Sequence, residues 1–289
     1  MKKQIIEFIS YLKVERNYAL NTQQAYQRDL HQLIIFLNVQ KISTWSQLTS
    51  EMLNLFMMQL RHKNICSRSI RRYMSSIRGL LTYLVNQEQL KHNCAVQLST
   101  PKIAQTLPET LNYDQLLQLL KPQGGTRFEQ RDITIIEVIY SCGLRVSELV
   151  SLNVEDVDLA QGFLSITGKG GKTRHTPLGT SAQEAIHQYV SERQSAPLFV
   201  NKNGERIGVR SVQNMIKKRA LNAGIKVNVY PHMLRHAAAT HFLQSSHDLR
   251  STQEFLGHAG IKSTQVYTHL DFLELSKVYD QCHPRAKKT

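Results

Sequence analysis

The sequence predicts a mainly helical α+β protein with two domains, on the basis of three observations. The chain has 289 residues, which exceeds the usual size of a single domain. Its first half repeats apolar side chains at helical spacing, and only the second half contains a short pair of strand patterns. A polar stretch with Pro101 and Pro108 separates the halves and cannot continue a helix. We therefore expect a helical domain over 1–98, a linker over 99–109, and a mainly helical domain with a small β-sheet or hairpin over 110–289.

Composition and charge restrict the classes of protein to consider. Hydrophobic residues make up 41% of the chain, which is typical of a globular protein and argues against a disordered one. The 36 Lys and Arg residues exceed the 22 Asp and Glu residues and give a net charge of +14. This surplus favours a polyanionic partner such as nucleic acid, although basic solvated surfaces are also common in proteins that bind none.

Neither a disulfide framework nor a zinc site is expected. The cysteines, Cys66, Cys94, Cys142 and Cys282, are scattered along the chain without a Cys-x-x-Cys pair. No apolar run approaches the length of a membrane-spanning helix, and the first residues lack the pattern of a secretion signal. We expect a cytoplasmic protein with no membrane insertion.

The first hundred residues are expected to be helical, and three segments show this pattern. Asn21 or Thr22 can cap one of them, whose apolar positions are Tyr26, Leu30, Leu33, Ile34 and Leu37. A second helix covers 52–60 after a cap at Thr49 or Ser50. The third, longer helix has an apolar stripe formed by Ile70, Tyr73, Met74, Ile77, Leu80, Leu81 and Leu84.

The polar face of the third helix and of the turn before it is basic. Segment 61–78 contains no acid, and its Lys and Arg residues are Arg61, Lys63, Arg68, Arg71, Arg72 and Arg78. A helix packed through its apolar stripe turns this charge outward, where it can bind a phosphate backbone. The alternative, a merely solvated face, usually mixes charges of both signs. Arg68, Arg71 and Arg72 are therefore candidate DNA contacts.

One hairpin is expected among the helices of the second domain. Residues 163–167 and 173–178 have strand character, and the glycine-rich stretch 168–171 joins them. The end of this turn is similar to a phosphate-binding P-loop, but the earlier glycine that such a loop requires falls on Ile166, and no helix follows. A nucleotide site is therefore not expected.

Four patterns in the second half contain cations or proton-transferring groups. In the first, Arg145 and Glu148 are spaced as neighbours on one helical face, although a plain surface ion pair explains this spacing equally well. In the second, Lys169 lies in the hairpin turn, from which a long flexible ammonium can reach a neighbouring cleft and give up a proton.

The third pattern begins at Pro231, which can start a helix. His232 and Arg235 then share one side near the positive end of that helix, where a phosphate would bind favourably. His232 and His236 also have a spacing that can bind a metal, but the Glu of a His-Glu-x-x-His site is absent and a cation lies between them. A metal site is the weaker interpretation.

The fourth pattern combines His258, which follows a glycine, with Tyr267 further along the chain. A lone tyrosine is usually a core residue, and its ordinary pKa of about 10 means that nucleophilic attack needs neighbouring cations that favour the phenolate. Together, the four patterns supply a nucleophile, cations for a charged transition state, and an acid for a leaving oxygen.

In their order and spacing these residues resemble the tyrosine recombinase, or phage integrase, family. Its motif is an Arg, a hairpin Lys, a His-x-x-Arg, a His and a nucleophilic Tyr. The resemblance runs along the whole chain and is most specific in residues 143–149, 168–170, 232–236, 239–241, 256–258 and 263–269. The C-terminal stretch is similar to that of bacterial recombinases that resolve chromosome dimers.

The resemblance implies how the phosphate is held. Arg145 and Arg235 would bind the scissile phosphate, and His258 would assist them. Glu148 would orient Arg145 and would not act as a general base.

The resemblance also implies the covalent and proton-transfer steps. Tyr267 would be the nucleophile and would hold the 3′ phosphate of the DNA, with His232 acting in its proton transfer. Lys169 would protonate the departing 5′ oxygen. A phosphotyrosine conserves the energy of the phosphodiester, so no ATP, metal or other cofactor is implied.

The partners implied are double-stranded DNA, a second recombinase of the same family in a heterotetramer, and a DNA translocase as regulator. The helical N-terminal domain would bind DNA and form a C-shaped clamp on the duplex with the catalytic domain. Two alternatives stay open: an integrase or transposase of a mobile element with the same chemistry, and a non-catalytic DNA-binding protein.

The C-terminal tail is expected to dock on a neighbouring subunit, as the resemblance implies for these assemblies. Its apolar residues are Phe272, Leu273, Leu275, Val278 and Tyr279, most of which could line one side of a short helix. The alternative is that this helix packs on its own domain.

Overall fold

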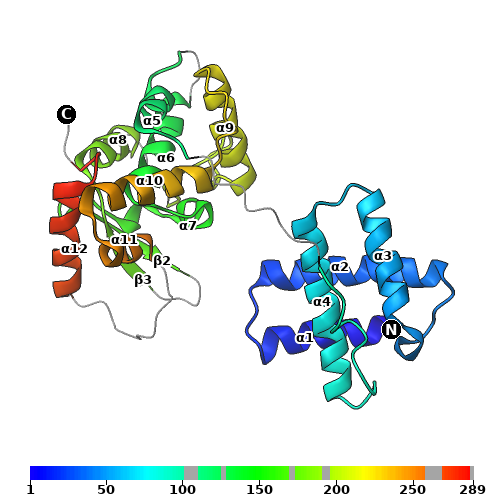
Figure 1. Ribbon diagram of the computed structural model, residues 1–289. Coiled ribbons are helices and arrows are strands. Elements are labelled where there is room, and N and C mark those ends of the chain that lie inside the picture. Colours follow the sequence, from blue (N-terminus) through cyan, green and yellow to red (C-terminus); the bar gives the residue numbers. More distant parts are fainter. Residues whose placement is uncertain (101–109, 125–127, 169–172, 191–195, 258–268, 287–289) are drawn as a thin grey trace. The chain divides into compact units, whose positions relative to one another are not determined.

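The chain divides into two compact units, Met1–Leu107 and Pro108–Thr289. A computed structural model describes residues 1–100, 110–124, 128–168, 173–190, 196–257 and 269–286, with the backbone alone for 269–274 (Figure 1). Helices dominate the described residues of both units, and the described sheet is small. The mainly helical α+β fold class is therefore confirmed. Most of the predicted linker lies outside the described residues, so its bounds stay a prediction.

The N-terminal unit is a helical bundle. Its elements are α1 (Lys2–Val14), α2 (Leu20–Val39), a 3₁₀ turn (Trp45–Gln47), α3 (Ser50–His62) and α4 (Ser67–Asn86). Helix α4 packs against α1 and α2, and the Phe56 ring of α3 lies 5.2 Å from Phe36 of α2 and 5.8 Å from Tyr73 of α4. The predicted apolar stripe of α4 is confirmed, because its aliphatic and Met residues are almost fully buried and Tyr73 is partly buried.

Helix starts in this unit follow the sequence in one case and differ from it in another. Thr49 caps α3, and its hydroxyl accepts a hydrogen bond from the Met52 amide at 3.4 Å. The predicted cap of α2 at Asn21 or Thr22 is wrong, because the helix begins at Leu20. The Ala19 carbonyl already accepts the Thr22 amide at 2.8 Å, so backbone hydrogen bonds replace a side-chain cap.

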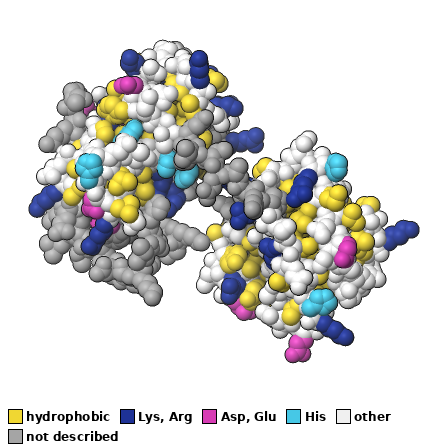
Figure 2. Space-filling model, in the orientation of Figure 1, with side chains coloured by type: hydrophobic (Ala, Val, Ile, Leu, Met, Phe, Trp, Pro, Cys, Tyr) yellow, Lys and Arg dark blue, Asp and Glu magenta, His cyan; other side chains and the backbone are white. Residues whose placement is uncertain are grey.

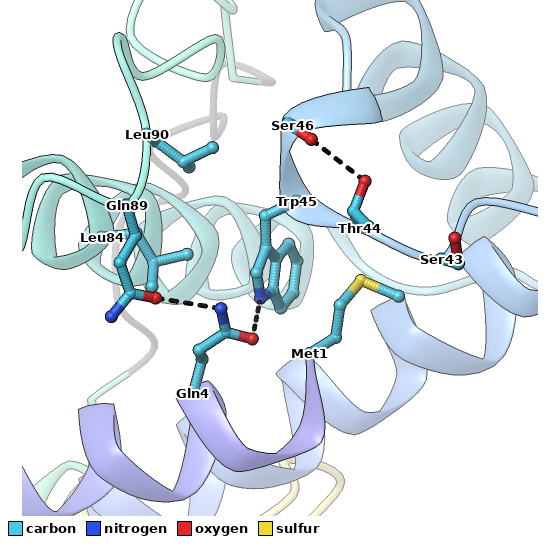
Figure 3. Close-up of a pocket in the computed structure, with 9 residues that line it drawn as sticks. All are labelled: Met1, Gln4, Ser43, Thr44, Trp45, Ser46, Leu84, Gln89 and Leu90. Carbon is cyan, nitrogen blue, oxygen red and sulfur yellow. Dashed lines mark hydrogen bonds between the residues drawn. The ribbon is translucent and has the colours of Figure 1, made fainter.

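A hollow beside the start of α1 is lined by Gln4, Trp45 and Gln89, which are joined by hydrogen bonds (Figure 3). The Gln4 carbonyl oxygen accepts from Trp45 Nε1 at 3.1 Å, and its amide nitrogen donates to Gln89 at 2.9 Å. Trp45 is buried, so its indole N–H needs such a partner. These contacts attach the 3₁₀ turn and the turn that follows α4 to α1.

The C-terminal unit surrounds helix α6, whose second half is fully buried. Its helices are α5 (Tyr113–Leu120), α6 (Glu129–Ser141), α7 (Val146–Ser151), a 3₁₀ turn (Val154–Asp156), α8 (Thr180–Val190), α9 (Val209–Asn222), α10 (Pro231–Ser246), α11 (Leu249–Leu256) and α12 (His269–Cys282). Helix α6 packs against α5, α7, α8, α9 and α10 (Figure 1). The second half of α6 is buried all round, which fits a helix at the centre of a core.

The sheet is antiparallel, in the order β1 (Val157–Asp158), β2 (Phe163–Thr167) and β3 (Thr173–Pro177). The predicted strand pair is confirmed, with the second strand ending one residue earlier than expected. Ile166 faces Arg174 across the ladder, and Leu164 faces Thr176. Cross-strand partners share one face of a sheet, and Ile166, Leu164 and Thr176 are buried, so Arg174 points toward the domain interior.

The described part of the tail packs on its own domain, as the alternative interpretation expected, and docking of the tail on a neighbouring subunit stays a prediction. Helix α12 contacts α10, α11 and β3, and Leu275 and Tyr279 are 6% and 1% exposed. His283 stacks on Tyr279 with ring centroids 4.5 Å apart, and Thr180 donates backbone and side-chain hydrogen bonds to the Ala286 carbonyl. These apolar groups complete the core of the chain itself. The side chains of Phe272 and Leu273 lie outside the described residues.

Candidate active site

The loop after α6 brings Arg145 to the start of α7. Gly143 has φ +58°, and a Cβ there would lie 2.9 Å from the Phe255 ring, so glycine suits both the turn and the close approach of α11. Arg145 is the N-cap residue of α7, and its amide donates to Glu148 at 2.8 Å. The first turn of this helix therefore folds the Glu148 carboxylate back toward Arg145.

Glu148 binds guanidinium groups from three different segments. Arg145 Nη1 donates to Glu148 Oε1 at 2.8 Å. Arg174 donates from Nη1 to Oε1 and from Nη2 to Oε2, both at 3.0 Å. Arg235 Nη1 lies 3.6 Å from Oε2. The Glu148 side chain is only 7% exposed, so this is not the plain surface ion pair that the spacing alone allowed.

Arg235 extends from the second turn of α10, which begins at Pro231 as predicted. Its Nη1 donates to the Gly143 carbonyl at 2.5 Å, and its Nη2 donates to the Leu256 carbonyl at 2.6 Å. Burial, together with the charge of Arg145, lowers the pKa of Arg235 to about 10, so the group remains a cation at neutral pH. Two backbone carbonyls thus fix the position of a buried positive charge.

The cluster of Arg145, Arg174, Arg235 and Glu148 has a positive net charge, because three guanidiniums surround one carboxylate. We call these four residues the arginine cluster. The Arg145 side chain is 45% exposed, whereas those of Arg174 and Arg235 are 12% and 4% exposed. A partly exposed guanidinium beside a second cation is suited to bind the oxygens of a phosphate.

His232 lies on the exposed side of α10, one helical turn before Arg235. Partial burial and the positive charges of Arg235, His236 and Arg145 lower the pKa of His232. The imidazole is therefore mostly neutral at pH 7 and can accept a proton from a substrate or a nucleophile.

The structure brings together three of the predicted site residues, namely Arg145, Arg235 and His232. Lys169, His258 and Tyr267 lie outside the described residues. Gly257, which precedes His258 in the sequence, lies against the Arg174 guanidinium. The roles of all six residues stay predictions.

Arg174 was missed by the sequence analysis. Its signal was an Arg at an interior-facing position of a strand, two residues before the buried Thr176. A buried cation requires an acidic partner, but the sequence does not say which acid it is.

Two regions of the chain match known families. Residues 5–88 match the description "Phage integrase, N-terminal SAM-like domain", and residues 109–274 match the "Phage integrase family". The chain belongs to the phage integrase family. It is a site-specific DNA recombinase enzyme of the tyrosine recombinase type.

Curated relatives resemble this recombinase over its full length. It is 42% identical to tyrosine recombinase XerC of Pseudomonas fluorescens, over 100% of this chain and 98% of the relative. It is 39% identical to tyrosine recombinase XerC of Pseudomonas aeruginosa, over 100% of this chain and 97% of the relative.

Solved structures of recombinases share the fold. A lambda integrase dimer bound to a core site has a TM-score of 0.74 at 14% identity, covering 92% of this chain and 98% of that one. XerH bound to a palindromic difH substrate has a TM-score of 0.71 at 24% identity, covering 96% of this chain and 84% of that one.

Helices of the described part of the recombinase are not long and apolar enough to cross a membrane.

The arginines on the basic face of α4 do not all have the same surroundings. On the face drawn in Figure 2, Lys and Arg side chains are more frequent than acidic ones. Arg68 and Arg71 are exposed, but Arg72 donates from Nε and Nη2 to Asp29 of α2, both at 2.8 Å. The Asp29 side chain is 1% exposed and that of Arg72 is 46% exposed. Arg72 therefore neutralises a buried acid, whatever else it binds.

We expect Arg68→Ala and Arg71→Ala each to reduce the slope of log affinity against log salt by roughly one unit on specific and on random DNA. Arg72→Ala should instead lower the free energy of unfolding by about 2 kcal/mol, because it leaves the buried Asp29 carboxylate without this counterion. Salt titrations and chemical denaturation separate the two effects. Unchanged slopes for Arg68→Ala and Arg71→Ala would indicate a merely solvated face.

The arginine cluster also predicts a pH dependence of stability. Burial opposes the ionisation of Glu148, but hydrogen bonds from Arg174 and from the Arg145 amide outweigh it and hold the pKa at about 2. A lowered pKa stabilises the folded state above the unfolded pKa of about 4.3, and this contribution disappears as the pH falls toward 2.

Glu148→Gln should therefore have a lower free energy of unfolding than the wild type at pH 7. In acid the two free energies should approach each other. We expect the difference in unfolding free energy to shrink by about 2 kcal/mol below pH 5, after allowance for solvent screening. Denaturant unfolding of both proteins across this range measures it. A difference that is independent of pH would mean that the carboxylate is not held as an anion.

Proposed function

We propose that the recombinase cleaves and rejoins DNA through a 3′-phosphotyrosyl intermediate on Tyr267. The observation that carries this proposal is the arginine cluster, where Arg145 is partly exposed beside the buried cation Arg235. Such a pair can bind both non-bridging oxygens of one phosphate and stabilise the charge that develops there. The match of residues 109–274 to the phage integrase family supports the choice of a tyrosine nucleophile.

The proposed cleavage step forms one bond and breaks one bond. The Tyr267 oxygen attacks the phosphorus, and its proton passes to His232, whose lowered pKa leaves it neutral. The bond to the 5′ oxygen breaks, and Lys169 donates a proton to that oxygen. Arg145 and Arg235 hold the phosphate, with His258 as a third donor. A free 5′ hydroxyl can then attack the phosphotyrosine, so the same groups rejoin DNA without ATP.

We further propose that the enzyme resolves chromosome and plasmid dimers at a dif-like site during cell division, in a heterotetramer with a XerD-type recombinase. The full-length likeness to proteins named XerC supports this role, as does the fold shared with XerH on its difH substrate. An FtsK-type translocase is the proposed regulator. The N-terminal unit and the catalytic unit would each bind the duplex, in the cytoplasm.

The test is incubation with a nicked duplex that carries the chromosomal dif-like site, with and without the XerD-type partner. A nick beside the cleavage point lets the released fragment diffuse away, so a cleaved complex accumulates. We expect a covalent protein–DNA complex on this site and not on random DNA, and full strand exchange only with the partner. Site binding without cleavage would indicate a non-catalytic protein. Exchange between two other sites without the partner would indicate a mobile-element integrase.

A further inference from the structure

We propose that Arg174 is a positioning residue for phosphate binding: through Glu148 it fixes the orientation in which Arg145 meets the scissile phosphate. This inference rests on the proposed function, since it concerns the same phosphate. Arg174 itself does not touch the substrate in this proposal, because its side chain is only 12% exposed and points into the domain.

Arg174 fixes the orientation of the Glu148 carboxylate. Arg174 places one nitrogen on each Glu148 oxygen at 3.0 Å, which defines the plane of the carboxylate. Arg145 uses both of the same oxygens, Oε1 through its side chain and Oε2 through its amide, each at 2.8 Å. Rotation of the carboxylate would break both Arg145 contacts. The two-point grip of Arg174 therefore limits where the Arg145 guanidinium can lie.

The position of Arg174 in the sheet directs its side chain toward the domain interior. Its partner across the ladder is the buried Ile166, so β3 holds the side chain on the interior face of the hairpin. The same hairpin turn contains Lys169 in the sequence. The Arg174–Glu148 pair is thus a link between the hairpin and the start of α7.

The end of α11 packs against the same guanidinium. A Cβ added to Gly257 would lie 2.5 Å from Arg174 Nε and 2.7 Å from Cζ, so only a glycine leaves room for Arg174 in this position. The preceding carbonyl, that of Leu256, accepts from Arg235 Nη2 at 2.6 Å. Arg174 is therefore packed between the carboxylate that orients Arg145 and the backbone that positions Arg235.

The chain offers a matched control for this pair. Arg285 donates from Nε and Nη2 to Glu137 at 2.9 Å each, and the Glu137 side chain is 2% exposed. This is a second two-point Arg–Glu pair with a buried acid in the same unit, and within the described residues its hydrogen bonds do not involve the arginine cluster. Arg174→Lys and Arg285→Lys both keep the positive charge but lose the planar guanidinium that binds both carboxylate oxygens.

The experiment measures DNA affinity and the single-turnover rate of covalent cleavage on the nicked site at saturating protein. For Arg174→Lys we expect affinity within about threefold of the wild type, because the charge is kept, and a cleavage rate lower by about 10- to 100-fold, because misplacement of about 1 Å can cost this much. For Arg285→Lys we expect both quantities within about threefold of the wild type. Thermal melting confirms that both variants are folded.

A second substrate separates positioning from a general loss of structure. A methylphosphonate at the scissile position lacks the negative charge, so its reaction depends less on correctly placed arginines. We expect the defect of Arg174→Lys to shrink at least about tenfold on this substrate. A merely structural defect would be equal on both substrates.

Wild-type cleavage by Arg174→Lys, or equal defects of Arg174→Lys and Arg285→Lys, would overturn the inference. Neither result would affect the assignment of Tyr267, which is tested by adduct formation in the wild-type protein.

Discussion

The Tyr267→Phe protein is expected to bind its DNA site with wild-type affinity and to form no covalent adduct. The substitution removes one oxygen and leaves every cation in place, so phosphate binding should persist while the nucleophile is lost. Binding is measured by gel shift on the intact site, and adduct formation by a denaturing gel on the nicked site. This is the largest effect that we predict, since a missing nucleophile has no substitute in the proposed mechanism.

Tyr279→Phe is the matched control. Tyr279 belongs to α12 and is 1% exposed within the core, so the same loss of a hydroxyl should leave adduct formation intact. Adduct formation by Tyr267→Phe would remove Tyr267 from the nucleophile role. Loss of the adduct in both variants would indicate that the C-terminal fold, and not the hydroxyl, is at fault.

Lys169→Ala should have the second-largest effect, on the rate of cleavage. Removing a general acid typically costs about 10²- to 10⁴-fold, because the 5′ oxygen must then leave without a proton. A substrate with sulfur in place of the bridging 5′ oxygen has a better leaving group and should recover much of the lost rate. Single-turnover cleavage of the two substrates gives the comparison.

Lys172→Ala is the control for Lys169→Ala, because it removes the same charge from the same hairpin turn. We expect its defect, if there is one, to be equal on the oxygen and sulfur substrates. An equal defect of Lys169→Ala on both substrates would exclude Lys169 as the general acid. Selective rescue of Lys172→Ala would transfer the role to Lys172.

Local patterns in the sequence predicted local structure well. The apolar stripe of α4 and the strands of the hairpin have the predicted periodicity, because burial of one face imposes it directly. The cap at Thr49 was also predictable, since it depends on residues a few positions apart. The start of α2 was not, because backbone hydrogen bonds at Ala19 replaced the expected side-chain cap.

Long-range ion pairs were beyond the sequence. Asp29 and Arg72 are 43 positions apart, and Glu148 and Arg174 are 26 apart, so no helical or strand period connects them. The basic face of α4 looked free of acid because its partner belongs to another helix. In the same way, Arg145 and Glu148 looked like a surface pair until β3 and α10 supplied two more cations.

The tail shows a further limit of sequence patterns. Apolar residues along α12 predicted a buried face, but not whether that face packs on its own chain or on another subunit. In the structure, Leu275 and Tyr279 complete the chain's own core, and Arg285 beyond the helix binds Glu137 of α6. Hydrophobic spacing reports that a surface is covered, and only the tertiary structure shows by what.

The central claim is tested most directly by locating the nucleotide on the trapped wild-type adduct. Trypsin cleaves after Lys262 and Lys277, and the resulting peptide 263–277 contains Tyr267 as its only tyrosine. After nuclease digestion, mass spectrometry should find the nucleotide on this peptide, attached through its 3′ phosphate. A nucleotide on any other peptide, or one attached through a 5′ phosphate, would contradict the account.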